Sequence, residues 1–230
     1  MQKFLLNATF GLAIAAFGLA ASANETIKKA VEAQFGAKVE KVTKTEYLGL
    51  YEVFADGQIL YTDEKASVFF VGSLYDKNGA NITGKRLIAN LPFDLAVKQV
   101  RGNGKGTMIT FEDPNCGYCK RLAKDILKLK DVTVYTFMMP ILGEDSVVKT
   151  KGIWCSADRA KAWNDWMING TKPGDPKKDC APPVEKLVKL GHDFQVTGTP
   201  MILFSDGSKV PGAIPLGEIE KKLAEIAKRG

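Results

Sequence analysis

The chain has 230 residues, a formal net charge of +6, four cysteines and one histidine. This length is enough to bury one large core or two small ones, so the cysteines are not needed to hold a minimal fold together. One histidine excludes the zinc and iron sites that need two or more histidines, and we expect no metal site.

The first residues are typical of a secretory signal peptide. Lys3 gives a positive start, residues 4–20 are uncharged and mostly apolar, and residues 21–23 form a small-x-small cleavage site. We therefore predict cleavage between Ala23 and Asn24. A membrane anchor is the alternative, but the apolar run is at the lower length limit for a membrane span. No later stretch is long and apolar enough to cross a bilayer, so we expect no membrane insertion after cleavage.

The next residues predict one helix and a small antiparallel sheet. Asn24–Phe35 has apolar residues at helical spacing. The runs 48–54 and 58–61 flank Asp56-Gly57, which is the strongest short signal for a hairpin. Residues 67–75 are rich in aromatic and branched side chains and predict a further strand.

Strands and helices alternate in the second half of the chain. Pro92 and the glycine-rich residues 102–106 place a domain boundary between residues 84 and 106. The expected elements are a strand over 107–111, a helix over 116–130, a strand over 132–138, helices over 144–169 (broken near Cys155) and 183–191, a hairpin of 201–204 with 209–210, and a helix over 216–228. This order is typical of an α/β domain with a helical insertion.

The sequence Cys116-Gly117-Tyr118-Cys119 follows a predicted strand and opens a predicted helix. Two thiols at this spacing can form and break a local disulfide. The unpaired N–H groups and the dipole at a helix N-terminus favour an anion, so Cys116 is the expected nucleophilic thiolate. Cys119 lies one turn further in and suits a resolving role. We therefore expect redox exchange at this motif.

Three other readings of the C-x-x-C motif fit less well. Covalent haem attachment needs a histidine directly after the motif, where this chain has Lys120. A zinc site needs a second ligand pair at short spacing, and Cys155 and Cys180 lie far apart in sequence. A purely structural bridge within one C-x-x-C is geometrically awkward.

Together these motifs resemble the DsbC family of periplasmic protein disulfide isomerases, whose catalytic domain is of the thioredoxin type. The resemblance extends over residues 24–230. The segments that carry it are Phe111–Cys119, Ile153-Trp154-Cys155 with Cys180, Val196–Pro200, residues 206–212 and residues 72–76.

The resemblance implies an α+β protein of several parts. A signal peptide (1–23) precedes a cystatin-like dimerisation domain of one helix and an antiparallel sheet (24–84). A linker (85–101) leads to a thioredoxin-like α/β domain with a helical insertion (102–230). It also implies a homodimer in which the N-terminal sheets pair and two active sites face a cleft for unfolded chains.

The resemblance also assigns roles to residues outside the C-x-x-C motif. It implies a cis Thr199–Pro200 peptide that faces the active cysteines and leaves the Thr199 backbone free to pair with a substrate strand. Without the resemblance a trans bond is expected, since cis is the minority isomer. Cys155 and Cys180 are best interpreted as a structural disulfide, with a second redox pair as the alternative.

One departure from the thioredoxin pattern concerns proton transfer. Thioredoxin carries a buried acid six residues before its first active cysteine, and this chain has Thr110 there. Glu112 and Asp113 are closer to Cys116, but acids at a strand end are usually solvated. We therefore expect no catalytic role for them.

The resemblance implies a periplasmic isomerase and reductase that acts on unfolded or misoxidised exported proteins. It implies a membrane thiol reductase of the DsbD type as partner, and no cofactor. The alternatives are a DsbA-like thiol oxidase and a non-catalytic holdase chaperone. Basic residues are dispersed among acidic ones, so nucleic-acid binding is not expected.

Overall fold

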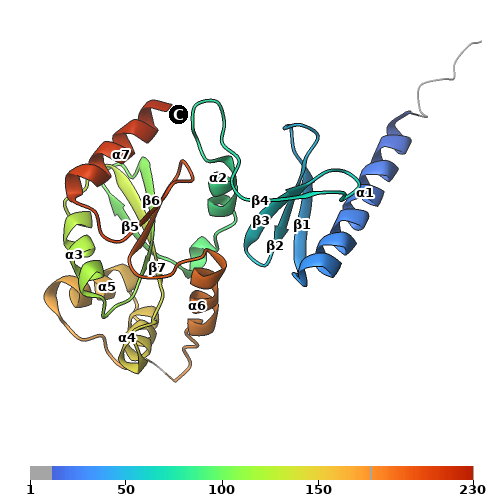
Figure 1. The fold of residues 1–230 in the computed structure, drawn as a ribbon. Helices are drawn as coiled ribbons and strands as arrows, with labels where there is room; N and C mark the ends of the chain where they lie inside the picture. Colours follow the sequence, from blue (N-terminus) through green and yellow to red (C-terminus); the bar gives the residue numbers. More distant parts are fainter. Residues whose placement is uncertain (1–11, 177, 230) are drawn as a thin grey trace, which may run out of the picture. The chain divides into compact units, whose positions relative to one another are not determined.

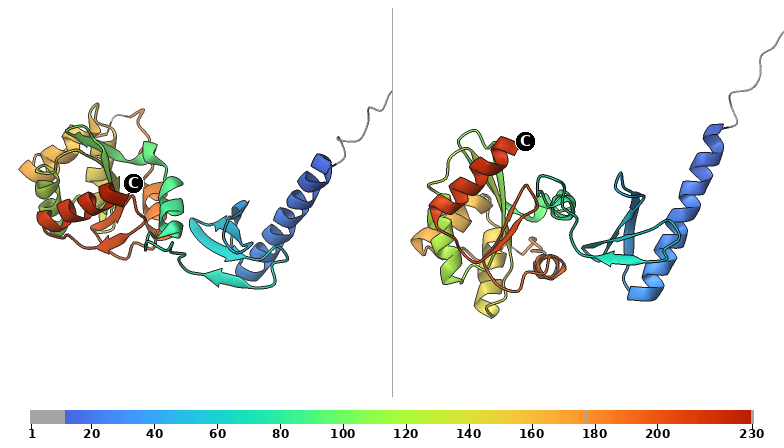
Figure 2. Two further views of the ribbon diagram at one scale, coloured as in Figure 1. Left: turned by 90° about the horizontal axis from the view of Figure 1, so that it is seen from above. Right: turned by 45° about the horizontal axis from the view of Figure 1, so that its top comes forward.

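A computed structural model describes residues 12–176 and 178–229, with only the backbone described for residues 12–22 (Figures 1 and 2). The chain divides into two compact units between Gly72 and Ser73. The predicted signal peptide lies partly outside the described residues: residues 1–11 are not described, and residues 12–23 form the start of the first helix.

The first unit is a helix packed on a small antiparallel sheet, as predicted, and the sheet has four strands. Its elements in chain order are α1 (Leu12–Phe35), β1 (Val39–Lys44), β2 (Tyr51–Ala55), β3 (Gln58–Thr62) and β4 (Phe69–Val71). Ile27 and Val31 of α1 pack on Tyr51 and Val53 of β2, and all four are buried. Asp56 and Gly57 join β2 to β3 with φ values of 46° and 74°, as a type I′ hairpin turn requires.

The last strand of this sheet is shorter than predicted. β4 covers Phe69–Val71 rather than residues 67–75, and Tyr75 makes only an isolated bridge with Asn81. β4 is an edge strand, and Phe70 and Val71 are 53% and 76% exposed. An edge with apolar side chains in solvent is suited to pairing with another strand.

The second unit is built on a five-stranded mixed sheet of order β5-β7-β6-β8-β9. The strands are β5 (Val97–Arg101), β6 (Gly106–Glu112), β7 (Val132–Met138), β8 (Met201–Phe204) and β9 (Lys209–Pro211). Only β6 and β7 pair in parallel, because the helix between them carries the chain back across the sheet. The predicted span of β7 is confirmed at both ends.

Helices cover both faces of this sheet (Figure 1). The helical elements are α2 (Ile82–Ala89), η1 (Phe93–Leu95), α3 (Gly117–Ile126), α4 (Glu144–Trp154), α5 (Arg159–Asn169), α6 (Val184–Asp193) and α7 (Leu216–Arg229). α3 and α7 share one core with Met108 of β6. On the opposite face, the Phe111 ring lies 5.2 Å from Phe137 and 5.8 Å from Phe194 of the α6 C-cap. The predicted helix break near Cys155 is also present, between α4 and α5.

β5 was not predicted, because its side chains reverse the usual pattern. Gln99 is buried and Val100 is 55% exposed. The Gln99 amide oxygen accepts hydrogen bonds from Asn164 of α5 at 2.9 Å and from Arg101 at 3.3 Å. The polar contacts are visible only in the fold, so periodicity did not reveal a strand in the segment predicted as a linker.

Candidate active site

The C-x-x-C motif lies at the turn from β6 into α3, as the sequence predicts. Cys116 is the N-cap of α3, with φ −71° and ψ 121°. Its sulfur takes the place that a serine or aspartate oxygen occupies at other helix starts, and it accepts the Cys119 backbone N–H at 3.4 Å. The unpaired N–H groups of the first turn are thereby directed toward this sulfur.

The two cysteines of the C-x-x-C motif differ in exposure. Both are free thiols, and Cys116 retains 7% of its surface whereas Cys119 has none. Burial raises the pKa of Cys119 well above its ordinary range, and the nearby Glu112 carboxyl raises it further. Tyr118 between them is 61% exposed. The arrangement therefore has an outer thiol that meets solvent and an inner thiol that is held protonated.

The cis-proline loop lies directly against the outer thiol. The Thr199–Pro200 peptide is cis, as the resemblance implies. Met201 follows as the first residue of β8 and pairs with Phe111 of β6, which fixes the loop beside the end of β6. The Cys116 thiol donates to the Thr199 carbonyl oxygen at 3.3 Å. The loop and the C-x-x-C motif, which lie far apart in sequence, thus meet at one sulfur atom.

The expectation that Asp113 is solvated is wrong. Its carboxylate is fully buried and accepts four hydrogen bonds. Oδ2 accepts the backbone N–H groups of Ile141 at 2.7 Å and Leu142 at 2.9 Å. Oδ1 accepts the Asn115 N–H at 2.7 Å and the Ser146 hydroxyl at 2.8 Å. Asp113 therefore ties the loop after β7 to the turn that carries Cys116.

The expectation for Glu112 is wrong as well. Its side chain is fully buried, and Oε1 accepts the Thr110 hydroxyl at 2.7 Å and the Thr136 hydroxyl at 3.5 Å. Burial raises the pKa of Glu112 to about 7, against the opposing effect of the two hydroxyls. The carboxyl therefore titrates near neutral pH within the core.

Trp166 of α5 is a supporting residue that sequence reasoning did not single out. Its indole N–H donates to the Pro114 carbonyl at 2.6 Å, just before the cysteines. The ammonium groups of Lys120 and Lys149 each lie 4.4 Å from the ring centroid, a distance at which cations are attracted to an indole. The helical insertion thereby contacts and supports the turn before Cys116. No local sequence motif predicts this contact between Trp166 and Pro114.

Cys155 and Cys180 form a disulfide bond in the structure. Cys155 is the C-cap of α4, and Cys180 lies in the segment that leads to α6. The bond therefore joins two parts of the helical insertion and stands apart from the C-x-x-C pair.

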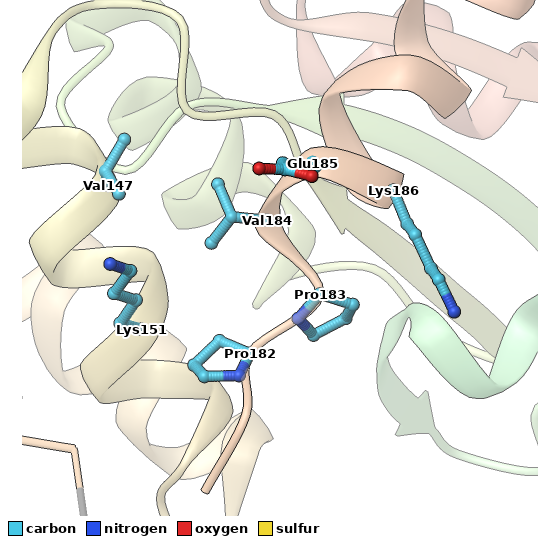
Figure 3. Close-up of a pocket in the computed structure, with 7 residues that line it drawn as sticks. All are labelled: Val147, Lys151, Pro182, Pro183, Val184, Glu185 and Lys186. Carbon is cyan, nitrogen blue, oxygen red and sulfur yellow. The ribbon is translucent and has the colours of Figure 1, made fainter.

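A pocket of about 430 Å³ opens between α4 and the start of α6 (Figure 3). Its lining comes from Val147 and Lys151 of α4 and from residues 182–186. The lining includes neither Cys116 and Cys119 nor the cis-proline loop. Across the described parts of the chain, we find no cluster of metal-ligating side chains and no helix that combines the length and apolar character of a membrane span.

Comparison with known proteins agrees with this geometry. Residues 93–227 match the model of a thioredoxin-like domain, and residues 18–84 match that of the disulfide bond isomerase protein N-terminal domain. The protein is thus a two-part thiol–disulfide oxidoreductase with a thioredoxin-like domain.

Individual relatives show which family of thiol–disulfide oxidoreductases the chain resembles. A probable thiol:disulfide interchange protein DsbC of Bordetella parapertussis is 44% identical, over 82% of this chain and 69% of the relative. The thiol:disulfide interchange protein DsbC of Escherichia coli is 29% identical over 94% of both chains. A solved disulfide interchange protein from Neisseria gonorrhoeae is 43% identical with a TM-score of 0.56, covering 59% of this chain and 97% of that one. The chain belongs to the DsbC family.

Proposed function

We propose that this protein is a periplasmic protein disulfide isomerase and reductase, which rearranges incorrect disulfides in exported proteins through Cys116 and Cys119. The observation that carries the proposal is the meeting of the helix N-terminus, the Cys116 sulfur and the Thr199 carbonyl, with Cys119 buried behind them. An outer nucleophile beside a backbone edge, backed by an inner thiol, is what exchange with a polypeptide disulfide needs.

The reaction begins when the Cys116 thiolate attacks a substrate disulfide. One substrate sulfur leaves as a thiolate, and the other forms a mixed disulfide with Cys116. The Thr199 backbone pairs with the substrate strand during this step. A second substrate thiol then attacks to complete isomerisation, or Cys119 attacks Cys116 and releases a reduced substrate.

The first unit serves dimerisation in this proposal. Its support is the open β4 edge, where Phe70 and Val71 are exposed, together with the match of residues 18–84 to the isomerase N-terminal domain. Two first units joined in a homodimer would bring two active sites to one substrate. A membrane thiol reductase of the DsbD type would return the C-x-x-C pair to its dithiol form.

Cys155 and Cys180 hold the helical insertion in this proposal and do not exchange. Their support is position: the bond links α4 to the segment before α6, and α4 supplies Ser146, a partner of Asp113 at the active-site turn. A bond in this position stabilises the helical insertion and stays oxidised whatever the state of the C-x-x-C pair.

The test is refolding of a scrambled-disulfide protein by the full-length wild type and by two single variants. Cys116→Ser should abolish rescue, since no nucleophile remains. Cys119→Ser should keep part of the isomerase activity but lose net reduction, since it can form the mixed disulfide but cannot resolve it. Full rescue by Cys116→Ser would favour the holdase alternative. A steady-state oxidised C-x-x-C pair in cells would favour the oxidase alternative.

A further inference from the structure

Glu112 lies on the face of β6 that α3 covers. Side chains of a strand alternate between the two faces, so Met108, Thr110 and Glu112 point the same way. Met108 packs with Leu122 and Ile126 of α3 in one core. Glu112, at the end of the strand, therefore points toward the first turn of α3.

Cys119 lies on the matching face of α3. It is fully buried and shares the inward side of the helix with Leu122, Ala123 and Ile126. The backbone N–H of Asp113 hydrogen-bonds to its sulfur. The inner thiol is thus at the end of β6, adjoining Glu112 in the same interior.

The Glu112 carboxyl has one oxygen bound and one free. Oε1 accepts the hydroxyls of Thr110 and Thr136, while Oε2 makes no hydrogen bond to any described residue. Thr136 comes from β7, where it pairs with Thr110 across the sheet. From α3 the titratable group that interacts with the carboxyl is Cys119, and no ion pair with a cation is described for it. A buried polar atom left without a partner is costly, so it calls for a reason.

We propose that Glu112 accepts the proton of Cys119 when Cys119 resolves the mixed disulfide. This rests on the proposed exchange at Cys116 and Cys119. The proton moves from the Cys119 sulfur to the Glu112 carboxylate, and the sulfur attacks Cys116. The Cys119–Cys116 bond forms, the Cys116–substrate bond breaks, and the substrate sulfur leaves as a thiolate. Two electrons pass from the enzyme dithiol to the substrate disulfide, and Glu112 then loses its proton to solvent.

Charge balance favours this route. Ionisation of Cys119 with Glu112 already charged would put two negative charges in one buried space, and the Glu112 charge raises the pKa of the thiol. Transfer to the carboxylate leaves one charge there. A group whose pKa is about 7 is present in both forms near neutral pH, as an efficient proton acceptor requires.

The position of this acid explains why the sequence pattern did not reveal it. The acid of thioredoxin lies six residues before the first cysteine, where this chain has Thr110. Glu112 is two residues further along the same strand, so it points to the same face. Thr110 occupies the position of the thioredoxin acid, and its hydroxyl donates a hydrogen bond to the Glu112 oxygen.

The test separates the two steps of exchange in the full-length protein. Reduced protein is mixed with excess oxidised glutathione in a stopped-flow instrument, so that formation of the Cys116–glutathione mixed disulfide and the release of glutathione by Cys119 are followed as successive phases from pH 5 to 9. Glu112→Gln should slow this release about 100-fold at pH 7, the lower range for general base catalysis. It should also remove the inflection near pH 7. Attack of Cys116 on oxidised glutathione should stay within about threefold of wild type.

Three further variants sharpen the test. Glu112→Asp keeps a carboxyl and should restore part of the rate and an inflection. Glu220→Gln, an exposed change on α7, should leave both steps unchanged. Thr110→Val removes a hydroxyl that lowers the Glu112 pKa, so its inflection should move to higher pH; this holds even if Glu112→Gln does not fold.

Two results would overturn the inference. One is a Glu112→Gln profile that matches wild type in rate and shape. The other is an equal loss in both steps, which would show a structural role only. If the wild-type Cys116 does not attack oxidised glutathione at all, the proposed exchange at Cys116 is refuted instead. Failure of the proposed function can therefore be distinguished from failure of the inference about Glu112.

Discussion

Gly84 of α2 gives the sharpest test of how the segment before β5 is held. A β-carbon built on Gly84 would lie 2.7 Å from the Gly207 Cα and 2.8 Å from its carbonyl carbon, with the carbonyl oxygen closer still. Gly207 is in the β8–β9 turn with φ +84°. The two backbones therefore touch, and only glycine allows it at this distance.

The cost of Gly84→Ala follows from this geometry. The Gly207 Cα alone must move by about 0.7 Å to reach ordinary contact at 3.4 Å, and the carbonyl oxygen, which is closer, must move further. Overpacking costs about 1–3 kcal/mol, and the upper part of this range, about 2–3 kcal/mol, applies here because the clashing atoms are backbone and cannot rotate away. The better helix propensity of alanine offsets about 1 kcal/mol. We expect a net destabilisation of about 1–2 kcal/mol, or a fall in Tm of about 3–6 °C for a unit of this size.

Gly217→Ala in α7 is the matched control. A β-carbon there meets nothing within 4 Å, so alanine should be neutral or stabilise by up to about 1 kcal/mol. Both variants are compared by thermal unfolding of the full chain, and hydrogen exchange of the α2 amides locates the change. Equal stability of the two variants, with unchanged protection of α2, would refute the reasoning.

Three further predictions concern the active-site side of the unit. Asp113→Asn should lower stability in urea unfolding by about 2–4 kcal/mol, because the amide keeps one oxygen and one of the two pairs of donors, at Oδ1 or at Oδ2, then faces an NH2 group instead of an acceptor. By contrast, Asp125→Asn removes only a partly exposed helix ion pair and should cost under about 0.5 kcal/mol. Replacing Cys155 and Cys180 together by serine should cost about 3 kcal/mol for a separation of 25 residues, with Cys116 alkylation rates unchanged. The pKa of Glu112 is about 7 in the fold against an ordinary 4.5, so the folded state holds a proton that the unfolded chain releases. Stability should therefore fall by about 3 kcal/mol as pH rises between these values, and Glu112→Gln should abolish this fall; a wild-type urea midpoint that is flat over this range would contradict it.

Local signals predicted those parts of the fold that depend on neighbouring residues. The Asp56-Gly57 turn needs two positive φ values, and Asp and Gly tolerate them, so the hairpin follows from two residues. The run over β7 is apolar enough to be buried on both faces, and its ends were predicted correctly. The position of the C-x-x-C motif at a strand–helix junction also follows from neighbouring residues, because the motif comes directly after one periodic segment and opens the next.

Long-range packing decided what sequence patterns missed. Gln99 is buried because Asn164 of α5 supplies its hydrogen bond, 65 positions away. Acids at a strand end are solvated only if nothing covers that end, and here the loop after β7 and the start of α4 cover it. The sequence around a buried residue does not show that a distant helix or loop will cover it.

Glu112 and Asp113 are adjacent at the end of β6, but their side chains point to opposite sides and have different roles. Successive side chains point to opposite sides, so Glu112 faces α3 while Asp113 turns toward the loop after β7. Asp113 has both oxygens occupied by four donors, which hold its side chain in one position. Glu112 has a free oxygen in a buried site and no described cation to keep it charged. The satisfied acid therefore supports the turn that carries Cys116, and the unsatisfied one is the group with freedom to exchange a proton with Cys119.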